Sequence, residues 1–146
     1  MPTRMPDVLY RYMAGLATHD VDLVATTVAE SLAFVGATRT LSKPEFLAML
    51  RALYTGFPDW RYAPDPPRTV GDTIAIRWRQ EGTHDGVFAL PGMPPIAPTG
   101  RRVVIPPHDF FYRIDADQLT YIRPDPVPGG APRGILEQIG VALPPL

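Results

Sequence analysis

The spacing of hydrophobic residues changes near residue 60, and the predicted secondary structure changes there from helix to strand. Before that point, apolar side chains recur every three or four positions, as they do on one face of a helix. Asp20 is a suitable N-cap for a second short helix, and Ser42 and Glu45 have the form of a capping box at a third, with Pro44 in its first turn. The pattern predicts helices at 8–16, 21–28 and 42–54.

After residue 60, apolar and polar side chains alternate, which is the period of a strand with one buried face. Ile74, Ile76 and Trp78 alternate in this way with arginines. The predicted strands are 60–62, 74–81, 103–114 and 119–123, with a polar turn at 115–117 and a closing helix at 134–139. Helices followed by antiparallel strands indicate an α+β fold, in which one curved sheet folds over a helical layer.

Length and composition limit the organisation and the partners of the chain. With 146 residues, of which 45% are hydrophobic, residues 1–146 fit a single domain. The net charge of -1 gives no excess positive field for nucleic acid or for an anionic membrane, so neither is expected as a partner. The chain has no long apolar run and its first residues lack the order of a signal peptide, which predicts a cytoplasmic protein.

The residue types also exclude several kinds of chemistry. The chain contains no cysteine, which excludes disulfides, thiolate metal sites and cysteine nucleophiles. Its three histidines lie far apart in the sequence, so no metal site is predicted. The sequence has no P-loop, dinucleotide-binding or serine-hydrolase motif, and we therefore expect no cofactor.

Short motifs in the second half of the chain resemble those of a known family. They are Phe57-Pro58-Asp59-Trp60, Gly82-Thr83-His84, Pro98-Thr99-Gly100-Arg101, Phe111-Tyr112-Arg113-Ile114 and Gln138-Ile139-Gly140. Their order and spacing resemble the SnoaL-like polyketide cyclases of the nuclear-transport-factor-2-like (NTF2-like) superfamily. The resemblance implies an NTF2-like cone, in which a bent antiparallel sheet wraps over three N-terminal helices around an internal apolar cavity. It also implies a homodimer formed through the outer face of the sheet, and cofactor-free chemistry on a small-molecule polyketide substrate.

Strand parity predicts which side chains face that cavity, because alternate residues of a strand share one face. If Trp78 points inward, Gln80 and His84 do so as well. In the next strand, an inward Tyr112 brings Phe110 and His108 with it. Aromatic walls with a few convergent polar groups are typical of a small-molecule site.

The same parity extends the predicted cavity into the last strand. There, an inward Leu119 brings Tyr121, Arg123 and Asp125 to the same face. The substrate-binding candidates are Trp60, Trp78, Gln80, His84, Phe110, Tyr112, Tyr121 and Arg123.

Asp125 is the leading catalytic candidate, and His108 is the second. The resemblance assigns the acid/base role to an aspartate that closes the final strand four residues after an aromatic residue, and Tyr121 and Asp125 fit that pattern. A carboxylate desolvated by apolar walls has a raised pKa, which makes it a better base for a carbon-bound proton. Flanking prolines also fit an exposed aspartate in a turn, and Arg123 on the same face would lower the pKa of Asp125.

Each histidine has a functional and a structural interpretation. His108 can bind a substrate carbonyl or transfer a proton near neutral pH, or it can be buried and bonded to the backbone. His84 can bind substrate, or it can hold its loop by side-chain hydrogen bonds. His19, at a helix boundary, is predicted to lie at the surface.

Three functions remain open from the sequence. The leading prediction is a cyclase of natural-product biosynthesis that closes a carbon-carbon ring by aldol chemistry, with Asp125 as the base and His108 or Gln80 stabilising the enolate. The second is pericyclic closure of a polyene, which needs aromatic walls and donors to a carbonyl but no base. The third is a non-catalytic protein that binds a small molecule, since one fold can serve many functions.

The proline-rich segments 90–99 and 126–134 are expected at the cavity entrance, either as lids or as static connections.

Overall fold

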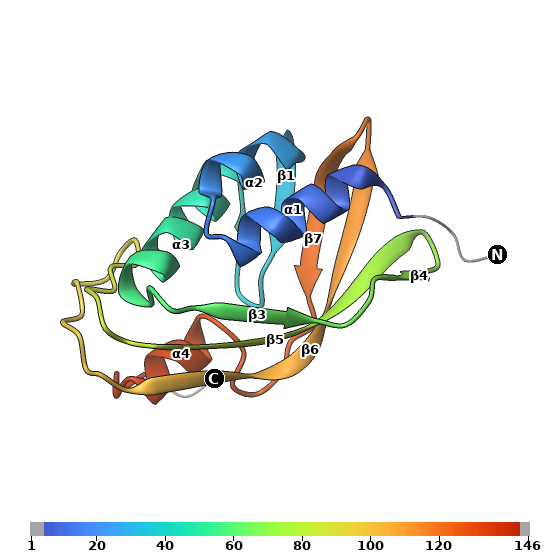
Figure 1. Ribbon diagram of the computed structural model, residues 1–146. Coiled ribbons are helices and arrows are strands. Elements are labelled where there is room, and N and C mark those ends of the chain that lie inside the picture. The colour runs from blue at the N-terminus through green and yellow to red at the C-terminus, as the bar shows by residue number, and fades with distance from the viewer. Residues whose placement is uncertain (1–4, 144–146) are drawn as a thin grey trace.

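The computed structural model describes residues 5–143, which form one curved sheet and a set of helices (Figure 1). The helices are α1 (Asp7–Ala17), α2 (Val21–Thr27), α3 (Lys43–Gly56) and α4 (Arg133–Gln138). The strands are β1 (Val28–Val35), β2 (Thr40–Leu41), β3 (Arg61–Pro64), β4 (Arg68–Val70), β5 (Thr73–Thr83), β6 (Arg102–Asp115) and β7 (Gln118–Pro124). The predicted α+β class is confirmed, as are the three N-terminal helices and the closing helix.

Local hydrogen bonds explain where two of the helices begin. The carboxylate of Asp20 accepts a bond from the backbone N–H of Leu23 at 3.0 Å, which caps α2. At α3, Ser42 and Glu45 each accept a bond from the backbone N–H of the other, which confirms the capping box. These bonds from Ser42 hold the pKa of Glu45 below its ordinary value.

The sheet is mixed, which corrects the expectation of a purely antiparallel one. Its strand order is β2-β1-β7-β6-β5-β3, with β4 paired to β5. Every pair is antiparallel except β1 and β7, which are parallel, with Val28 opposite Leu119. The helical spacing of Val21, Val24 and Val28 conceals β1, because Val28 both completes the helical pattern and begins the strand.

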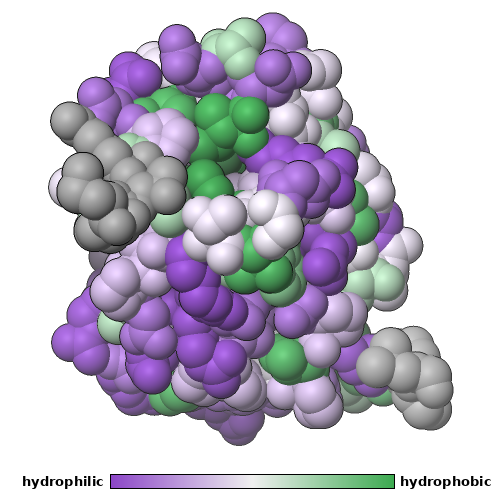
Figure 2. Space-filling model, turned by 90° about the vertical axis from the view of Figure 1, so that its right-hand side faces the viewer, coloured by the Kyte–Doolittle hydropathy of each residue, from purple (hydrophilic) through white to green (hydrophobic). Residues whose placement is uncertain are grey.

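The sheet bends around the helices, so that one of its faces is concave. Figure 1 shows α1, α2 and α3 together on that side of the long strands β5 and β6. One buried cluster lies beneath these helices, and a second joins the end of α3 to α4 and the loop at 86–100. In the face shown by Figure 2, hydrophilic side chains cover most of the surface, with small apolar areas between them. Within residues 5–143, no helix combines the length and the apolar character that crossing a membrane requires.

A register shift between β5 and β6 changes the inward-facing parity of β6. The pairing moves from Trp78 with His108 to Gln80 with Ile105, so β6 contains an extra residue beside its two prolines. A bulge at this place is compatible with proline, which has no N–H to donate to a neighbouring strand. As a result, Ile105 and His108 are both buried although they are three positions apart.

A second register shift lies between β6 and β7. Ile114 pairs with Leu119, whereas the preceding Arg113 pairs with Tyr121, so Thr120 is an extra residue in β7. A single extra residue reverses which face the following side chains occupy. This reversal decides the orientation of the whole C-terminal part of β7.

Candidate functional site

The concave face of β5 carries the polar and aromatic side chains that parity predicts. Trp78, Gln80 and His84 are buried, whereas the arginines on either side of Trp78 are exposed. Trp60, immediately before β3, is also buried, and its indole Nε1 donates to Oε1 of Gln80 at 3.3 Å. The inward orientation of Trp60, Trp78 and Gln80 is therefore confirmed. The buried indole N–H of Trp60 has the side-chain oxygen of Gln80 as its hydrogen-bond acceptor.

The pairing of β6 with β5 places the predicted residues of β6 on the same face. His108 lies opposite Trp78, and Phe110 and Tyr112 continue the same alternation along β6. Directly opposed residues of antiparallel strands project to one side of the sheet. The inward orientation of His108, Phe110 and Tyr112 is confirmed.

The predicted orientation of β7 is wrong, and Tyr121 lies on the outer face. Because Thr120 is an extra residue, Leu119 and Ile122 both point inward, and both are fully buried. Tyr121 pairs instead with the outward Arg113, whose guanidinium lies 4.8 Å from the centre of the Tyr121 ring.

Arg123 and Asp125 lie on the outer face as well, which corrects their assignment to the cavity. The guanidinium of Arg123 lies 4.6 Å from the centre of the Phe111 ring and donates to the carboxylate of Asp125 at 3.0 Å. The backbone N–H of Asp125 donates to the carbonyl of the outward-facing Asp109 at 2.8 Å, and the Asp125 side chain is 43% exposed. A solvated and ion-paired carboxylate lacks the desolvation that would make it a strong base.

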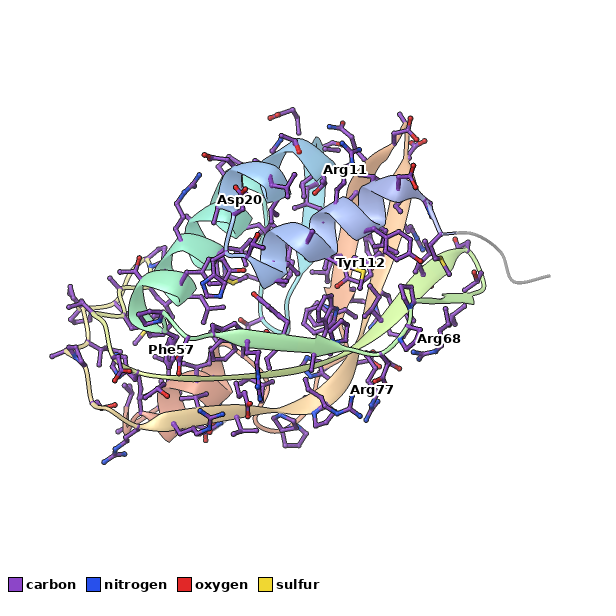
Figure 3. The ribbon with its side chains drawn as sticks, in the orientation of Figure 1. Arg11, Asp20, Phe57, Arg68, Arg77 and Tyr112 are labelled. Carbon is purple, nitrogen blue, oxygen red and sulfur yellow. The ribbon has the colours of Figure 1, made fainter. Side chains whose placement is uncertain are left out.

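Four tyrosines from four elements meet between the helices and the concave face. They are Tyr12 of α1, Tyr54 of α3, Tyr62 of β3 and Tyr112 of β6, and we call them the tyrosine cluster; Tyr112 is labelled in Figure 3. The hydroxyl groups of Tyr54 and Tyr62 lie 2.8 Å apart, and the rings of Tyr12 and Tyr112 meet edge to face with 5.7 Å between their centres. The hydroxyl of Tyr112 also accepts a bond from the indole Nε1 of Trp78 at 2.8 Å. The Trp78 ring, 5.5 Å from that of Tyr62, links the two tyrosine pairs.

Burial keeps every hydroxyl of the tyrosine cluster protonated. It raises the pKa of Tyr54 to about 12, and it raises the pKa values of Tyr12, Tyr62 and Tyr112 above the ordinary value of 10.0. Among residues 5–143, no aspartate or glutamate is buried. The concave face therefore offers neutral hydrogen-bond donors and no desolvated carboxylate.

The sequence identifies only one member of the tyrosine cluster as a site candidate, namely Tyr112. Tyr12 and Tyr54 occur at apolar positions of their predicted helices, which by itself indicates core packing. That their hydroxyl groups converge with Tyr112 depends on how the helices cross the sheet. The one sequence signal for this convergence is that Tyr12 and Tyr54 place a polar hydroxyl at a helical position that otherwise holds apolar core residues.

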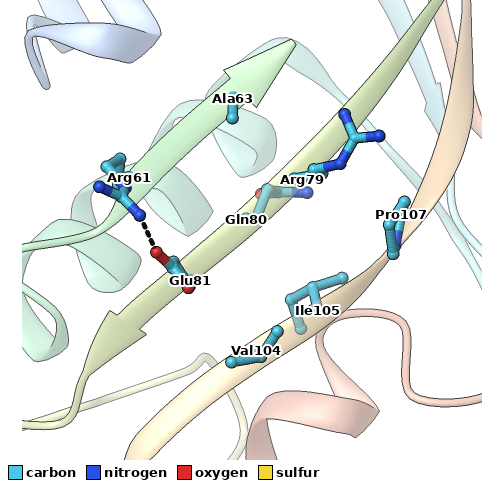
Figure 4. A pocket seen from close by; sticks show the side chains of 8 residues that line it. All are labelled: Arg61, Ala63, Arg79, Gln80, Glu81, Val104, Ile105 and Pro107. Atoms are coloured by element: carbon cyan, nitrogen blue, oxygen red, sulfur yellow. Dashed lines mark hydrogen bonds and ion pairs between the residues drawn. The ribbon is translucent and has the colours of Figure 1, made fainter. Parts of the chain in front are cut away.

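Side chains fill the space in which the resemblance implies an internal cavity. Tyr12, Trp78 and Tyr112 are each at most 3% exposed and belong to one packed cluster. The two best-formed hollows among the described residues have volumes of about 160 and 270 Å³ and lie on the outer face. Figure 4 shows the larger one, bordered by exposed residues such as Arg61, Arg79 and Val104. Both are smaller than the roughly 300–1,000 Å³ of typical small-molecule sites.

The contacts of His84 and His108 fit their structural interpretations. Nδ1 of His84 lies 2.9 Å from the hydroxyl of Thr99 and accepts a bond from the Thr99 backbone N–H, which joins the motif at 82–84 to the motif at 98–101. Burial lowers the pKa of His84, which keeps the ring neutral. Nδ1 of His108 donates to the carbonyl of Pro106 at 2.8 Å, so its Nε2 is the nitrogen left to accept a proton.

His19 is half-buried, which corrects its predicted position at the surface. Its Nε2 lies 2.7 Å from the carbonyl oxygen of Trp60, and its ring stacks on Tyr54. Residues 5–143 contain no group of three or more side chains suited to hold a metal ion.

Asp59, in the Phe-Pro-Asp-Trp motif, stabilises the end of β5. Its carboxylate accepts a bond from the backbone N–H of Thr83 at 2.7 Å, which lowers the pKa of Asp59. A carboxylate whose pKa is lower in the folded state stabilises the fold above its unfolded-state pKa, and this stability is lost as the pH falls through the folded-state pKa. We expect Asp59→Asn to be less stable than the wild type at pH 7 and the difference to shrink below about pH 4.

Urea unfolding at several pH values measures this difference. Asp85→Asn, at an exposed aspartate just after the end of β5, is the matched control and should follow the wild type. A constant difference between Asp59→Asn and the wild type at all pH values would contradict the assigned role of the charge.

The fold is shared with solved structures of low sequence identity. AclR from Streptomyces galilaeus, a candidate hydroxylase, superposes with a TM-score of 0.72 at 16% identity, over 92% of this chain and 79% of AclR. A candidate SnoaL-like polyketide cyclase from a Jannaschia species gives a TM-score of 0.70 at 16% identity, over 98% and 99% of the two chains. An NTF2-like protein of unknown function from Burkholderia pseudomallei gives 0.67 at 13% identity, over 92% and 96%. At these identities the likeness shows the fold alone, which is NTF2-like.

No curated protein matches the sequence. The model of the SnoaL-like domain family, however, matches residues 9–122, which include most of α1 and nearly the whole sheet. The predicted family is thereby confirmed, and the chain belongs to the SnoaL-like domain family.

Proposed function

We propose that this protein is a cofactor-free polyketide cyclase that closes a carbon-carbon ring at its concave face. The observation that carries the proposal is the tyrosine cluster, where neutral hydroxyl groups from four elements meet among apolar side chains. Membership of the SnoaL-like family supports the substrate class, as does the likeness to the Jannaschia cyclase candidate.

The tyrosine cluster suits the stabilisation of an oxygen that becomes negative during ring closure. A hydroxyl group has one proton to donate, and Tyr112 already accepts a bond from the indole of Trp78, so its own proton can be donated to a substrate carbonyl. Donors that are fixed in a dry site stabilise a developing oxyanion strongly, because no water has to reorganise. Holding the reacting carbons together adds roughly 7–11 kcal/mol in favourable intramolecular cases.

Substrate reaches these hydroxyl groups only when the packing around them opens. Tyr12 is carried by α1, which covers the concave face and packs through Leu9 and Leu16. A movement of α1 would therefore uncover Tyr12 and Tyr112 together. The NTF2-like fold, with its helices on one side of the sheet, allows such a movement without breaking strand pairing.

A second candidate function is pericyclic ring closure of a polyene. It is favoured by the observation that no aspartate or glutamate is buried among residues 5–143. Such a reaction needs a shaped apolar site and donors to a carbonyl, both of which the concave face offers, and it needs no base.

Incubation of the protein with linear polyketides tests the proposed function. The expected product is an isomer of unchanged mass that forms faster than in buffer, detected by liquid chromatography and mass spectrometry. In D2O, deuterium at a ring carbon supports the aldol route, and its absence supports the pericyclic route. Tight binding without any isomer would contradict both and indicate a binding protein.

Asp125→Asn is expected to leave the rate of ring closure within about twofold of the wild type, because Asp125 lies on the outer face and is paired with Arg123. Loss of a true acid/base residue typically lowers the rate about 10²- to 10⁴-fold. The measurement is the initial rate of isomer formation by the folded variant. A fall in the rate of ring closure by that factor would show that Asp125 is the acid/base residue after all.

A further inference from the structure

His19 is held in an unusual conformation between α1 and α2. Its backbone φ of 58° lies in the left-handed region, which few residue types other than glycine adopt readily, histidine being one of them. The imidazole ring lies parallel to the ring of Tyr54, with 3.9 Å between ring centres and 4° between ring planes. The ring is thus fixed by packing as well as by the backbone.

A hydrogen bond determines which ring nitrogen of His19 carries the proton. Nε2 lies 2.7 Å from the carbonyl oxygen of Trp60. A carbonyl oxygen can only accept, so Nε2 carries the hydrogen and, in the neutral ring, Nδ1 has the free lone pair. The Trp60 carbonyl is well placed for this role, because its residue is anchored by a backbone bond from its N–H to Phe57 and by its buried indole ring.

The position of His19 connects it to the tyrosine cluster. Tyr54, on which the ring stacks, bonds through its hydroxyl to Tyr62. His108 and His84 also have one bonded ring nitrogen each, but they pack beside Phe110 and Phe57, with 4.9 and 5.2 Å between ring centres. His19 is therefore the histidine that combines a fixed tautomer with direct contact to a member of the cluster.

The geometry points to His19 as the general base of the ring-closing reaction, an inference that rests on the proposed function. Nδ1 takes a proton from the carbon next to a carbonyl whose oxygen is bound by the tyrosine hydroxyls. The C–H electron pair becomes an enolate, and the new imidazolium keeps its Nε2–H bond to the Trp60 carbonyl. The enolate carbon then attacks a second carbonyl carbon, and the resulting alkoxide takes the proton back from His19.

Deuterium exchange into 2-tetralone tests this role without requiring the natural substrate. This bicyclic ketone has exchangeable protons next to its carbonyl, and mass spectrometry measures their replacement in D2O. We expect the wild type to accelerate the exchange, and His19→Gln to lose at least about 100-fold of that acceleration. Glutamine retains an N–H for the Trp60 carbonyl but has no base. Asparagine tolerates the left-handed backbone conformation, so His19→Asn should lose the acceleration of exchange to the same extent.

Asp20→Asn is the matched control at the next residue, since asparagine caps α2 as well as aspartate does. It should exchange 2-tetralone like the wild type. Far-ultraviolet circular dichroism confirms that each variant is folded, and fluorescence titration with 2-tetralone measures its binding.

The outcomes separate this inference from the proposed function. No acceleration by the wild type, or wild-type exchange by folded His19 variants, would overturn the role of His19. Ring closure of a polyketide at the wild-type rate by His19→Gln would do the same and leave the cyclase function standing. Exchange that depends on His19, without ring closure of any polyketide, would support the base and overturn the cyclase.

Discussion

Tyr112→Phe is expected to slow ring closure by about 10²- to 10³-fold, because one donor to a developing oxyanion typically contributes that factor. The charge develops in the transition state, so kcat should fall while KM changes little. The variant also leaves the buried Nε1–H of Trp78 without its acceptor, and we expect the free energy of unfolding to fall by about 1–3 kcal/mol. Steady-state kinetics and urea unfolding measure the two effects.

The matched control for this variant is Tyr10→Phe, at a tyrosine of α1 that is 49% exposed. Its kinetics and its stability should equal those of the wild type. If Tyr112→Phe behaves like Tyr10→Phe, the tyrosine cluster has no part in the reaction. If only stability changes, the cluster is a structural network.

Gly86→Ala is expected to lower the free energy of unfolding by about 3 kcal/mol, the upper part of the range for overpacking. A Cβ at Gly86 would lie 2.0 Å from the carbonyl oxygen of Thr55, which belongs to the backbone at the end of α3 and cannot rotate away. The close approach exists because the Gly86 N–H donates to the carbonyl of Gly56 at 3.0 Å. Phe88, which packs on Phe57, would be lifted from the second buried cluster with the loop at 86–100.

Gly71→Ala separates this clash from the general cost of replacing glycine. Gly71 has a φ of 60°, but a Cβ there would meet no atom within 4 Å. The free energy of unfolding of Gly71→Ala should fall by about 1 kcal/mol, which is the cost of placing an L-residue in the left-handed region. Thermal or urea unfolding compares the two variants. Equal losses would show that the 86–100 loop can move away from α3 without cost.

The sequence predicts those elements of the fold whose signals are local. The capping box at Ser42 and the alternation through Trp78 depend only on neighbouring residues, and both are confirmed. The turn at 115–117 is likewise confirmed, with positive φ at Ala116 and Asp117. β1 is different, because its eight residues become a strand through pairing with β7, a partner far away in the sequence.

The same distinction explains the prediction of the site. Parity places Gln80 and Tyr112 correctly, because each is counted from a neighbour within its own regular stretch of strand. It fails for Tyr121 and Asp125, because the extra residue at Thr120 has no mark in the sequence: a threonine in a strand is ordinary. The convergence of Tyr12 with Tyr112 is a tertiary property, and no spacing along the chain encodes it.

The parallel pairing of β1 with β7 also imposes an order on biosynthesis. Roughly 90 residues separate paired positions such as Val28 and Leu119, so closing this contact carries a large loop entropy and raises the contact order of the domain. On the ribosome, β1 emerges with only the short strand β2 available to pair with it. Leu32 and Phe34, which are buried in the folded protein, therefore remain exposed in the nascent chain until β7 has been synthesised. During that interval they offer apolar surface to which chaperones can bind.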